Sequence, residues 1–402
     1  MGSQTMIHLF INALAASAGG GLTYVRNVIP TLAERNDVKV SIAADPSFRE
    51  EFRQFANVEF VYLDLSPVRR FWFEQSRLPD LIRRSGANVL LSTGNFALRK
   101  SPVPQVLLSR NSIYTSADYS RDLRQRHDYR TWADTHLRAV LARKSIHWAD
   151  VTVAPTEAFA AELREWSRVS VLAIHHGFDR EAFVQNSKPL PEETEAKIRA
   201  ADGALKLLFV SHYNYYRNFE TLIRALPLVR SQIGNQSVRL LLTCELAAGK
   251  NPGAYRPDTA ASLIRELGVS EMVVELGTIP YEQLYQLYAR ADFYVTPAYT
   301  ETFAHPLVEA MSSGLPVIAS DIPVHREICG DSALYFERFS PSAIAETTVR
   351  VARSPESAKR MAASGRERAK AFSWKKHAEE ILGVARTLVS PSFPYPSEVV
   401  EV

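Results

Sequence analysis

The stretch V-T-P-A-Y-T-E-T-F-A-H-P-L-V-E-A-M-S-S-G-L-P-V-I-A-S, from Val295 to Ser320, predicts a strand end, a polar loop, a short helix and a second strand. Pro306 suits the first turn of the helix, because the N–H that proline lacks would have no helical partner there. Gly314 suits the position that ends the helix, and Pro316 prevents the helix from continuing. The stretch therefore predicts a strand–helix–strand unit.

Two carboxylates frame the start of this predicted helix. Glu301 lies in the loop and Glu309 lies in the second turn, eight residues further on. Eight residues correspond to a rotation of roughly 80° in a helix, so we expect both side chains to face one cleft. The backbone N–H groups of residues 302–305 would point into the same loop, which suits an anion.

The rest of the chain alternates strands with helices, which predicts parallel, doubly wound α/β sheets. A first series has strands at 7–12, 38–43, 58–63, 88–92, 105–109, 151–155 and 169–174, with helices at 22–35, 45–55, 71–85, 117–148 and 156–166. The polar, proline-containing stretch 186–197 then predicts the start of a linker. A second series has strands at 206–211, 238–243, 272–276, 293–297 and 317–320, with helices at 218–230, 258–267 and 281–291, around Glu309, and from 341 to 388. Open sheets of this kind bind ligands beyond the carboxyl ends of their strands.

Composition narrows the class of protein. The 402 residues are 46% hydrophobic and 23% charged, and a chain of this length and composition can form two domains, each with its own hydrophobic core. A net charge of +3 is compatible with phosphorylated ligands or an anionic membrane surface and too weak to indicate nucleic acid. The two cysteines, Cys244 and Cys329, lack metal-ligand spacing and indicate a reducing compartment. No apolar run approaches the ~20 residues of a membrane span, and no signal peptide is evident. We expect a cytoplasmic protein, with peripheral contact at the inner face of the membrane left open.

The frame Glu301-T-F-A-H-P-L-V-Glu309, followed by A-M-S-S-G-L-P-V-I-A-S, closely resembles the donor-site motif of retaining glycosyltransferases of family 4, which have the GT-B fold. The resemblance implies that Glu301 contacts the transferred sugar and that Glu309 accepts hydrogen bonds from the ribose hydroxyls. It also assigns to the donor four residues between them: Thr302, Phe303, Ala304 and Leu307. The alternative is that both glutamates are solvated residues flanking a helix.

The segment F-V-S-H-Y-N-Y-Y-R-N-F-E-T-L-I-R-A resembles the family's V-G-R-L-x-x-x-K-N-x-x-x-L-I-x-A, in which an arginine and a lysine embrace the nucleotide diphosphate. His212 replaces the arginine and Arg217 replaces the lysine. Arg217 is permanently charged and suits phosphate, whereas the charge of His212 depends on its surroundings. A solvated Arg217 and an uncharged packing role for His212 remain alternatives. Gly277 and Thr278 lie where the family's loop holds the nucleobase, and a plain turn explains them equally well.

In the first series, Gly19–Gly21 follows the first strand and opens a helix. Tyr24 occupies the place of the third glycine of a dinucleotide-binding motif, which argues against a nicotinamide cofactor. The resemblance brings Gly20 and Gly21 near the donor phosphate and the acceptor, and a plain turn is the alternative.

Two further strand ends carry candidate residues. Asn111 stands where many relatives hold a histidine near the reaction centre, and asparagine cannot act as a general base. Asn111 stays a catalytic candidate, with Glu301 and Arg217, because its amide can hydrogen-bond a sugar hydroxyl. Arg110 and Asn95 are candidates for the acceptor side. The alternative for Arg110 and Asn111 is a strand-end loop that makes local hydrogen bonds, and the alternative for Asn95 is a role in the turn.

The helical stretch 117–148 is rich in arginine, at positions 121, 124, 126, 130, 138 and 143. A basic, aromatic surface suits an acceptor or anionic lipid heads. A solvated helix face with its aromatic side chains inside is the favoured interpretation.

The resemblance predicts four parts: an acceptor-binding domain at 1–185, a nucleotide-sugar-binding domain at 186–375, a closing helix at 376–390 and a tail at 391–402. It implies transfer of a hexose-type unit, with retained configuration, from a UDP- or GDP-sugar to a hydroxyl of a saccharide, glycolipid or other acceptor in glycan or polysaccharide synthesis. No D-x-D motif occurs, so we expect neither a metal nor another cofactor. A nucleotide-sugar epimerase of the same fold and a non-catalytic sugar-nucleotide-binding protein stay open.

Overall fold

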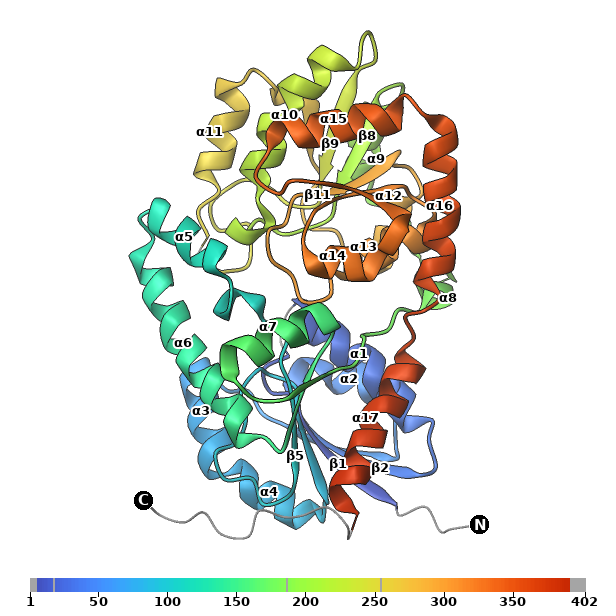
Figure 1. Ribbon diagram of the computed structural model, residues 1–402. Helices are drawn as coiled ribbons and strands as arrows, with labels where there is room; N and C mark the ends of the chain where they lie inside the picture. Colours follow the sequence, from blue (N-terminus) through green and yellow to red (C-terminus); the bar gives the residue numbers. More distant parts are fainter. Residues whose placement is uncertain (1–5, 17–18, 186, 254, 391–402) are drawn as a thin grey trace. The chain divides into compact units, whose positions relative to one another are not determined.

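The computed structural model of the chain describes residues 6–16, 19–185, 187–253 and 255–390. The chain divides into two compact units. Unit 1 comprises Met1–Thr115, His136–Gly177 and Ser373–Val402, and unit 2 comprises Ser116–Thr135 and Phe178–Phe372. Each unit is built around one parallel sheet with helices on both faces (Figure 1). This confirms the predicted α/β class with two doubly wound sheets.

The sheet of unit 1 has the strand order β3-β2-β1-β4-β5-β6-β7, and every pairing is parallel. Its strands are β1 (Ile7–Asn12), β2 (Val38–Ala44), β3 (Val58–Tyr62), β4 (Val89–Ser92), β5 (Gln105–Leu108), β6 (Val151–Ala154) and β7 (Val171–Ala173). All six side chains of β1 are buried, as expected for a strand covered on both faces.

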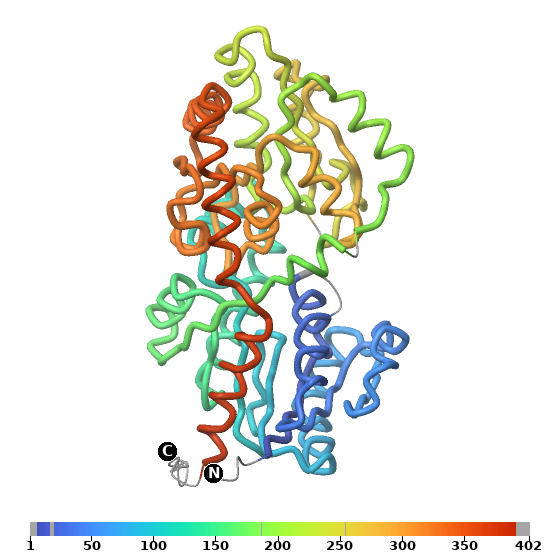
Figure 2. Tube along the Cα trace, turned by 90° about the vertical axis from the view of Figure 1, so that its right-hand side faces the viewer, coloured from blue at the N-terminus to red at the C-terminus, as the bar shows by residue number. Residues whose placement is uncertain are grey.

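The helices of unit 1 cover this sheet. They are α1 (Gly19–Ala33), α2 (Arg49–Phe52), α3 (Pro67–Ser76), α4 (Leu78–Ser85), the part of α6 (Tyr129–Trp148) from His136 onward, α7 (Glu157–Ser167) and α17 (Trp374–Val389), with 3-10 turns η1 (Pro46–Phe48) and η2 (Ser112–Tyr114). The last helix, α17, packs against α1 and β1 (Figure 2). It contributes buried side chains to their core. The two ends of the chain's sequence therefore share one hydrophobic core.

Two predicted helices are each divided in the structure. The helix predicted over 71–85 is α3 followed by α4, because Pro79 lacks the N–H that would continue α3 and fits only the first turn of a new helix. The helix predicted over 117–148 is α5 (Ala117–Gln125) followed by α6. His127 has φ 56°, a left-handed conformation that ends a helix.

The sheet of unit 2 has the strand order β10-β9-β8-β11-β12-β13 and is also parallel. Its strands are β8 (Leu205–Phe209), β9 (Val238–Leu242), β10 (Val273–Glu275), β11 (Phe293–Thr296), β12 (Val317–Ser320) and β13 (Ala333–Phe336). Its helices, besides α5 and the start of α6, are α8 (Arg180–Gln185), α9 (Glu192–Arg199), α10 (Phe219–Gln232), α11 (Asp258–Glu266), α12 (Tyr281–Tyr288), α13 (His305–Ser313), α14 (Pro323–Cys329), α15 (Pro341–Ala352) and α16 (Pro355–Ala369), with 3-10 turns η3 (Tyr215–Arg217), η4 (Ser270–Met272) and η5 (Gly330–Ser332).

The polar stretch predicted to be a linker contains a helix, α9. Its first turn carries acidic residues and its last turn carries Lys197 and Arg199, a distribution that complements the helix dipole. Thr194 and Ile198 supply a narrow buried face. The stretch 186–197, predicted as the start of a linker, is therefore helical from residue 192 onward, a feature that a search for apolar periodicity missed.

The helix of the opening stretch, α13, begins and ends as predicted. Pro306 lies in its first turn, and Gly314 ends it with φ 75°. Ala304, just before the helix, also has a left-handed backbone, with φ 60°. Glu301 therefore lies outside the helical repeat, and the predicted rotation between the two glutamates does not describe their relation.

The contacts within the chain group residues 116–135 and 178–185 with unit 2, whereas the sequence interpretation placed both in the first domain. The predicted tail lies outside the described residues. Among the helices that the structure describes, none is both long and apolar enough to cross a membrane.

Candidate active site

The predicted donor residues of unit 2 lie on loops that leave neighbouring strands. Arg217 follows β8 and Glu301 follows β11, and these strands pair directly. The Arg217 guanidinium forms an ion pair with the Glu301 carboxylate, and their side chains are only 18% and 8% exposed. The carboxyl edge of the sheet thus brings together a guanidinium and a carboxylate that are far apart in the sequence.

The backbone around Arg217 is fixed by two asparagines. The side chain of Asn214 accepts a hydrogen bond from the Arg217 N–H at 3.1 Å. Asn218 has φ 57° and donates to the carbonyls of Pro297 and Arg338, at 3.1 and 2.7 Å. The Arg217 guanidinium also lies 5.4 Å from the ring centre of Tyr216. The short turn η3 therefore presents Arg217 from a backbone held on both sides.

His212 lies in the same loop and has an exposed side chain. Partial desolvation of the ring, and then the positive charge of Arg217, lower the pKa of His212 below its ordinary value. The ring is therefore neutral at pH 7 and can take part in hydrogen bonding, but it adds no positive charge.

Glu309 is buried on α13, and the hydroxyl of Tyr288 donates a hydrogen bond to it at 2.7 Å. Burial raises the pKa of Glu309 to about 7, and the hydrogen bond from Tyr288 opposes this rise. The Glu309 carboxyl is thus protonated more readily than an exposed glutamate. Tyr288, at the end of α12, was missed from the sequence because no motif links it to a residue 21 positions away.

The remaining donor residues divide into backbone and side-chain candidates. Phe303 is buried, with its ring centre 5.4 Å from that of Phe372, and Leu307 is also fully buried. These two side chains belong to the core, so only their backbone can contact a ligand. Thr302 is partly exposed, whereas Ala304 is 7% exposed. Gly277, with φ 77°, and the exposed Thr278 follow β10 at the same edge of the sheet.

In unit 1, Arg110 ties together the loops that follow β1, β4 and β5. Its guanidinium donates to the carbonyls of Gly20 and Thr93 at 2.8 and 2.6 Å, and its N–H donates to the Asn95 side chain at 2.6 Å. A Cβ on Gly21 would lie 3.2 Å from the Cα of Ala16 and 3.5 Å from the guanidinium, so a side chain there would crowd the loop. Four predicted residues, Gly20, Gly21, Asn95 and Arg110, therefore form one cluster.

Arg110 is positively charged in an apolar setting. Burial lowers the pKa of Arg110 to about 10, and its guanidinium lies 5.0 Å from the ring centre of Tyr24. Asn111, the next residue, accepts a long hydrogen bond of 3.4 Å from the Ile113 N–H at the start of η2. In the structure Asn111 has the local role that the sequence left open as its alternative.

The arginine-rich stretch does not form a uniform solvated face. Arg121, Arg124 and Arg130 are exposed, but the Arg126 side chain is 19% exposed and forms an ion pair with Glu220. The favoured interpretation was wrong for Arg126. Its buried partner lies 94 positions further along the chain, so the helical pattern gave no sign of it.

Two family models match the chain. The model described as "Glycosyl transferases group 1" matches residues 191–368, and the model described as "Glycosyltransferase Family 4" matches residues 18–182. The first match contains Arg217, Glu301 and Glu309, and the second contains Gly20, Gly21, Asn95, Arg110 and Asn111.

Curated relatives carry one repeated description. The chain is 24% identical over 267 residues to a D-inositol 3-phosphate glycosyltransferase of Corynebacterium aurimucosum, covering 65% of the chain and 62% of the relative. It is 32% identical over 127 residues to a protein of the same description from Nocardia farcinica, covering 32% of the chain and 28% of that relative. The matched stretches thus span less than two thirds of these relatives' own length.

Solved structures share the fold. Sucrose-phosphate synthase from Thermosynechococcus elongatus matches with a TM-score of 0.74 and 20% identity, over 95% of the chain and 99% of that protein. Anabaena HepE in complex with UDP-glucose matches with a TM-score of 0.67 and 15% identity, over 94% of the chain and 100% of that protein. Two parallel sheets of this topology, with these neighbours, define a GT-B glycosyltransferase fold. Within that class, the chain belongs to family 4 of the glycosyltransferases.

Proposed function

We propose that the chain transfers a hexose-type sugar from a nucleoside diphosphate sugar to an acceptor hydroxyl, with retention of the anomeric configuration. The observation that carries this proposal is the ion pair of Arg217 and Glu301 at the carboxyl edge of the unit 2 sheet. Glu309 follows on the helix that begins directly after the same loop.

The chemistry of these residues suits a departing diphosphate. Negative charge develops on the leaving group, and a fixed guanidinium stabilises that charge without reorganisation during the reaction. Arg217 can bind two phosphate oxygens at once. A bound diphosphate would compete with Glu301 for the guanidinium and would leave the carboxylate available to orient the sugar.

Glu309 suits the ribose of the donor. A carboxylate accepts hydrogen bonds from two adjacent hydroxyls, and Tyr288 fixes the orientation of the Glu309 side chain. Because burial raises the pKa of Glu309, a ribose that donates to it would favour the ionised form.

We assign the acceptor to unit 1. Arg110 and Asn95 supply a charged and a polar group beside the glycine loop, and they suit a hydroxylated or phosphorylated acceptor. Asn111 cannot accept the acceptor's proton, so we propose a front-face displacement in which a leaving-group oxygen takes that proton. Glu301 then orients and stabilises the sugar rather than attacking it.

The proposed transfer requires no metal and no further cofactor, because Arg217 and the backbone at the start of α13 would do the work of a divalent cation. The acceptor class remains a proposal: a saccharide, a glycolipid or another hydroxyl compound in glycan synthesis. For a glycolipid acceptor we also propose peripheral contact with the inner face of the membrane. Turnover that persists in EDTA would agree with metal independence, and turnover restored only by a divalent cation would refute it.

The first test is a thermal-shift panel of UDP, GDP and their glucose, galactose, N-acetylglucosamine and mannose derivatives. A ligand that binds only the folded chain stabilises it by an amount that grows with the logarithm of ligand concentration above Kd, about 2.7 kcal/mol at one hundred times Kd, and so raises its melting temperature. We expect one nucleotide series to raise the melting temperature. No shift at millimolar concentrations of either series would refute the proposal.

The second test separates transfer from other reactions of the donor. The preferred donor is incubated with and without glycolipid and saccharide extracts, and the products are followed by NMR. Formation of a new glycosidic bond with the donor's anomeric configuration supports the proposal. Conversion of the donor alone into an epimer would indicate a different enzyme of the same fold.

A further inference from the structure

The segment Ser116–Thr135, called here the inserted segment, lies in sequence between strands β5 and β6 of unit 1 but belongs to unit 2. It contacts three connections, each of which follows the carboxyl end of a strand of the unit 2 sheet; in the first of them the contact is made at the start of α10. Arg126 binds Glu220, after β8; Asp122 binds Tyr299, after β11; and Asp118 binds Arg338, after β13. The first two of these connections carry Arg217 and Glu301.

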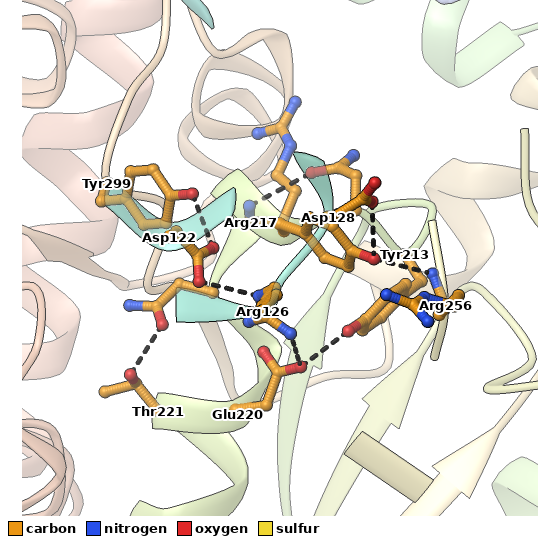
Figure 3. Close-up of polar contacts among 12 residues, drawn as sticks. Asp122, Arg126, Asp128, Tyr213, Arg217, Glu220, Thr221, Arg256 and Tyr299 are labelled. Carbon is orange, nitrogen blue, oxygen red and sulfur yellow. Dashed lines mark hydrogen bonds and ion pairs between the residues drawn. The ribbon is translucent and has the colours of Figure 1, made fainter. Parts of the chain in front are cut away.

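Arg126 is the centre of these contacts (Figure 3). It donates to Glu220 at 3.0 Å and to Asp122 at 2.7 Å, and its guanidinium lies 4.3 Å from the ring centre of Tyr215. The Glu220 side chain is only 5% exposed. Burial alone would raise the pKa of Glu220, but the charge and hydrogen bond of Arg126, together with hydrogen bonds from Tyr213 and the backbone, hold that pKa below its ordinary value. Both groups are therefore ionised at neutral pH, in a place where an ion pair is screened weakly.

The loop that carries Arg217 is fastened before and after that residue. Tyr213 donates to Glu220 at 2.6 Å, which closes residues 213–220 into a compact loop. Tyr215, under the Arg126 guanidinium, donates to Asp128 of the inserted segment at 3.4 Å and accepts from the Arg256 N–H at 3.2 Å. Figure 3 shows Arg217 beside this group, with its guanidinium pointing away from it.

The loop that carries Glu301 is attached to the same group. The Tyr299 hydroxyl donates to Asp122 at 2.9 Å, and the Tyr299 N–H donates to the carbonyl of Tyr216 at 3.1 Å. Arg126 and Asp122 are themselves joined, so one pair of side chains touches both loops. Besides the ion pair of Arg217 and Glu301 themselves, the two loops thus share contacts to Arg126 and Asp122.

We propose that Arg126 is a positioning residue of the donor site, which holds the Arg217 loop and the Glu301 loop in the register that a nucleoside diphosphate needs. This inference rests on the proposed function. It gives the inserted segment a role in recognition of the donor's diphosphate, exerted through the loops that carry Arg217 and Glu301.

Arg126→Met tests the inference through the selectivity of nucleotide binding. Calorimetry with UDP and UMP, and with GDP and GMP, gives two affinities for each nucleoside. If Arg126 positions Arg217, we expect a loss of about tenfold for the diphosphate of the preferred series, equivalent to about 1.4 kcal/mol, and less than twofold for its monophosphate. Arg124→Met is the matched control, because Arg124 is an exposed arginine of the same segment; it should leave all four affinities unchanged.

A double-mutant cycle with Arg217→Ala then asks whether Arg126 acts through Arg217. We expect Arg126→Met to cause no further loss of diphosphate affinity in the Arg217→Ala chain. A further tenfold loss in that chain would overturn the inference. An equal loss for diphosphate and monophosphate would also overturn it, because that result indicates a purely structural role.

Removal of Arg126 leaves Glu220 buried with its charge, so Arg126→Met could fail to fold. The double variant Arg126→Met/Glu220→Gln removes both charges. Arg126→Lys keeps the positive charge but loses the planar guanidinium that donates to Asp122 and Glu220 at once. We expect the double variant to show the same selective loss, and Arg126→Lys to recover part of the affinity. Unchanged diphosphate affinity in the folded double variant would refute the inference. Failure of the unmodified chain to bind any of the four nucleotides would instead refute the proposed function, and this inference with it.

Discussion

Glu301 and Arg217 form an ion pair with little exposure, so a diphosphate that binds Arg217 has to compete with a carboxylate. Glu301→Gln removes this competitor and keeps the shape of the side chain. We expect the variant to bind UDP or GDP at least as tightly as the unmodified chain, and to lose about 10² to 10³ in turnover, the range for loss of one fixed polar group at a reaction centre. Calorimetry gives the affinity and product formation gives the rate. Transfer at the unmodified rate would show that Glu301 has a different role.

Glu309 predicts a pH dependence of stability. The pKa of Glu309 rises from 4.5 in the unfolded chain to about 7 in the folded chain. The stability that the protonated carboxyl contributes to the folded chain is therefore fully present below about pH 4.5 and is lost as the pH rises through about 7. Glu309→Gln stays neutral at every pH. We expect the variant, relative to the unmodified chain, to gain on the order of 3 kcal/mol between pH 5 and pH 8. Urea denaturation at both pH values checks this.

The same variant should bind nucleotide more weakly at pH 8, because an amide cannot replace a carboxylate that accepts from two hydroxyls. A stability difference between Glu309→Gln and the unmodified chain that does not change with pH would contradict the assigned pKa of Glu309.

At the scale of elements, the docking of α17 on unit 1 depends on one glycine. A Cβ on Gly177 would lie 2.0 Å from the backbone nitrogen of Trp374, and the Trp374 ring itself packs against Tyr24 and His176. We expect Gly177→Ala to cost about 3 kcal/mol or more, because the clash is with backbone and cannot be relieved by a rotamer change. Scanning calorimetry of the full chain measures the loss.

Gly383→Ala is the matched control for Gly177→Ala. Gly383 lies in the middle of α17 on its exposed side, and a Cβ there meets no atom within 4 Å. Alanine favours the helix, so we expect a gain of about 0.5–1 kcal/mol. If both variants lost stability equally, the loss would reflect the sensitivity of α17 to any substitution and not the contact between Gly177 and Trp374.

Elements whose ends carry specific residues could be predicted from the sequence. Pro306 and Gly314 set the limits of α13, and the apolar runs set the strands and hence the fold. The sequence could also place Arg217 and Glu301 at strand ends, where parallel sheets gather side chains. It could not show their ion pair, the bond from Tyr288 to Glu309 or the burial of Arg126, because such pairs depend on distant residues and leave no periodic signal.

At the scale of the whole molecule, neither unit is one continuous stretch of chain. A fragment limited to residues 178–372 would lose the Arg126 partner of Glu220 and the Asp122 partner of Tyr299. We expect this fragment to be less stable than a version with residues 116–135 joined to it through a flexible linker, by about 1.5–3 kcal/mol for each hydrogen bond to a charged group that is lost. Urea denaturation of both fragments gives the difference.

The linked fragment carrying Arg126→Met is the control for this comparison. It should lose most of the stability that the added segment restores. Equal stability of residues 178–372 with and without residues 116–135 would show that the ion pair contributes little to unit 2.

Because unit 2 is built from two separate stretches of the chain, the position of a crossover decides whether a hybrid of two related genes keeps unit 2 intact. A hybrid made by a single crossover near residue 178 would join the second part of this chain to a first part from a relative, and would replace residues 116–135 with a foreign sequence. A hybrid that exchanges residues 116–135 together with 178–372 would instead inherit a matched set of side chains. Exchange of donor specificity between relatives should therefore succeed only when residues 116–135 are exchanged together with residues 178–372.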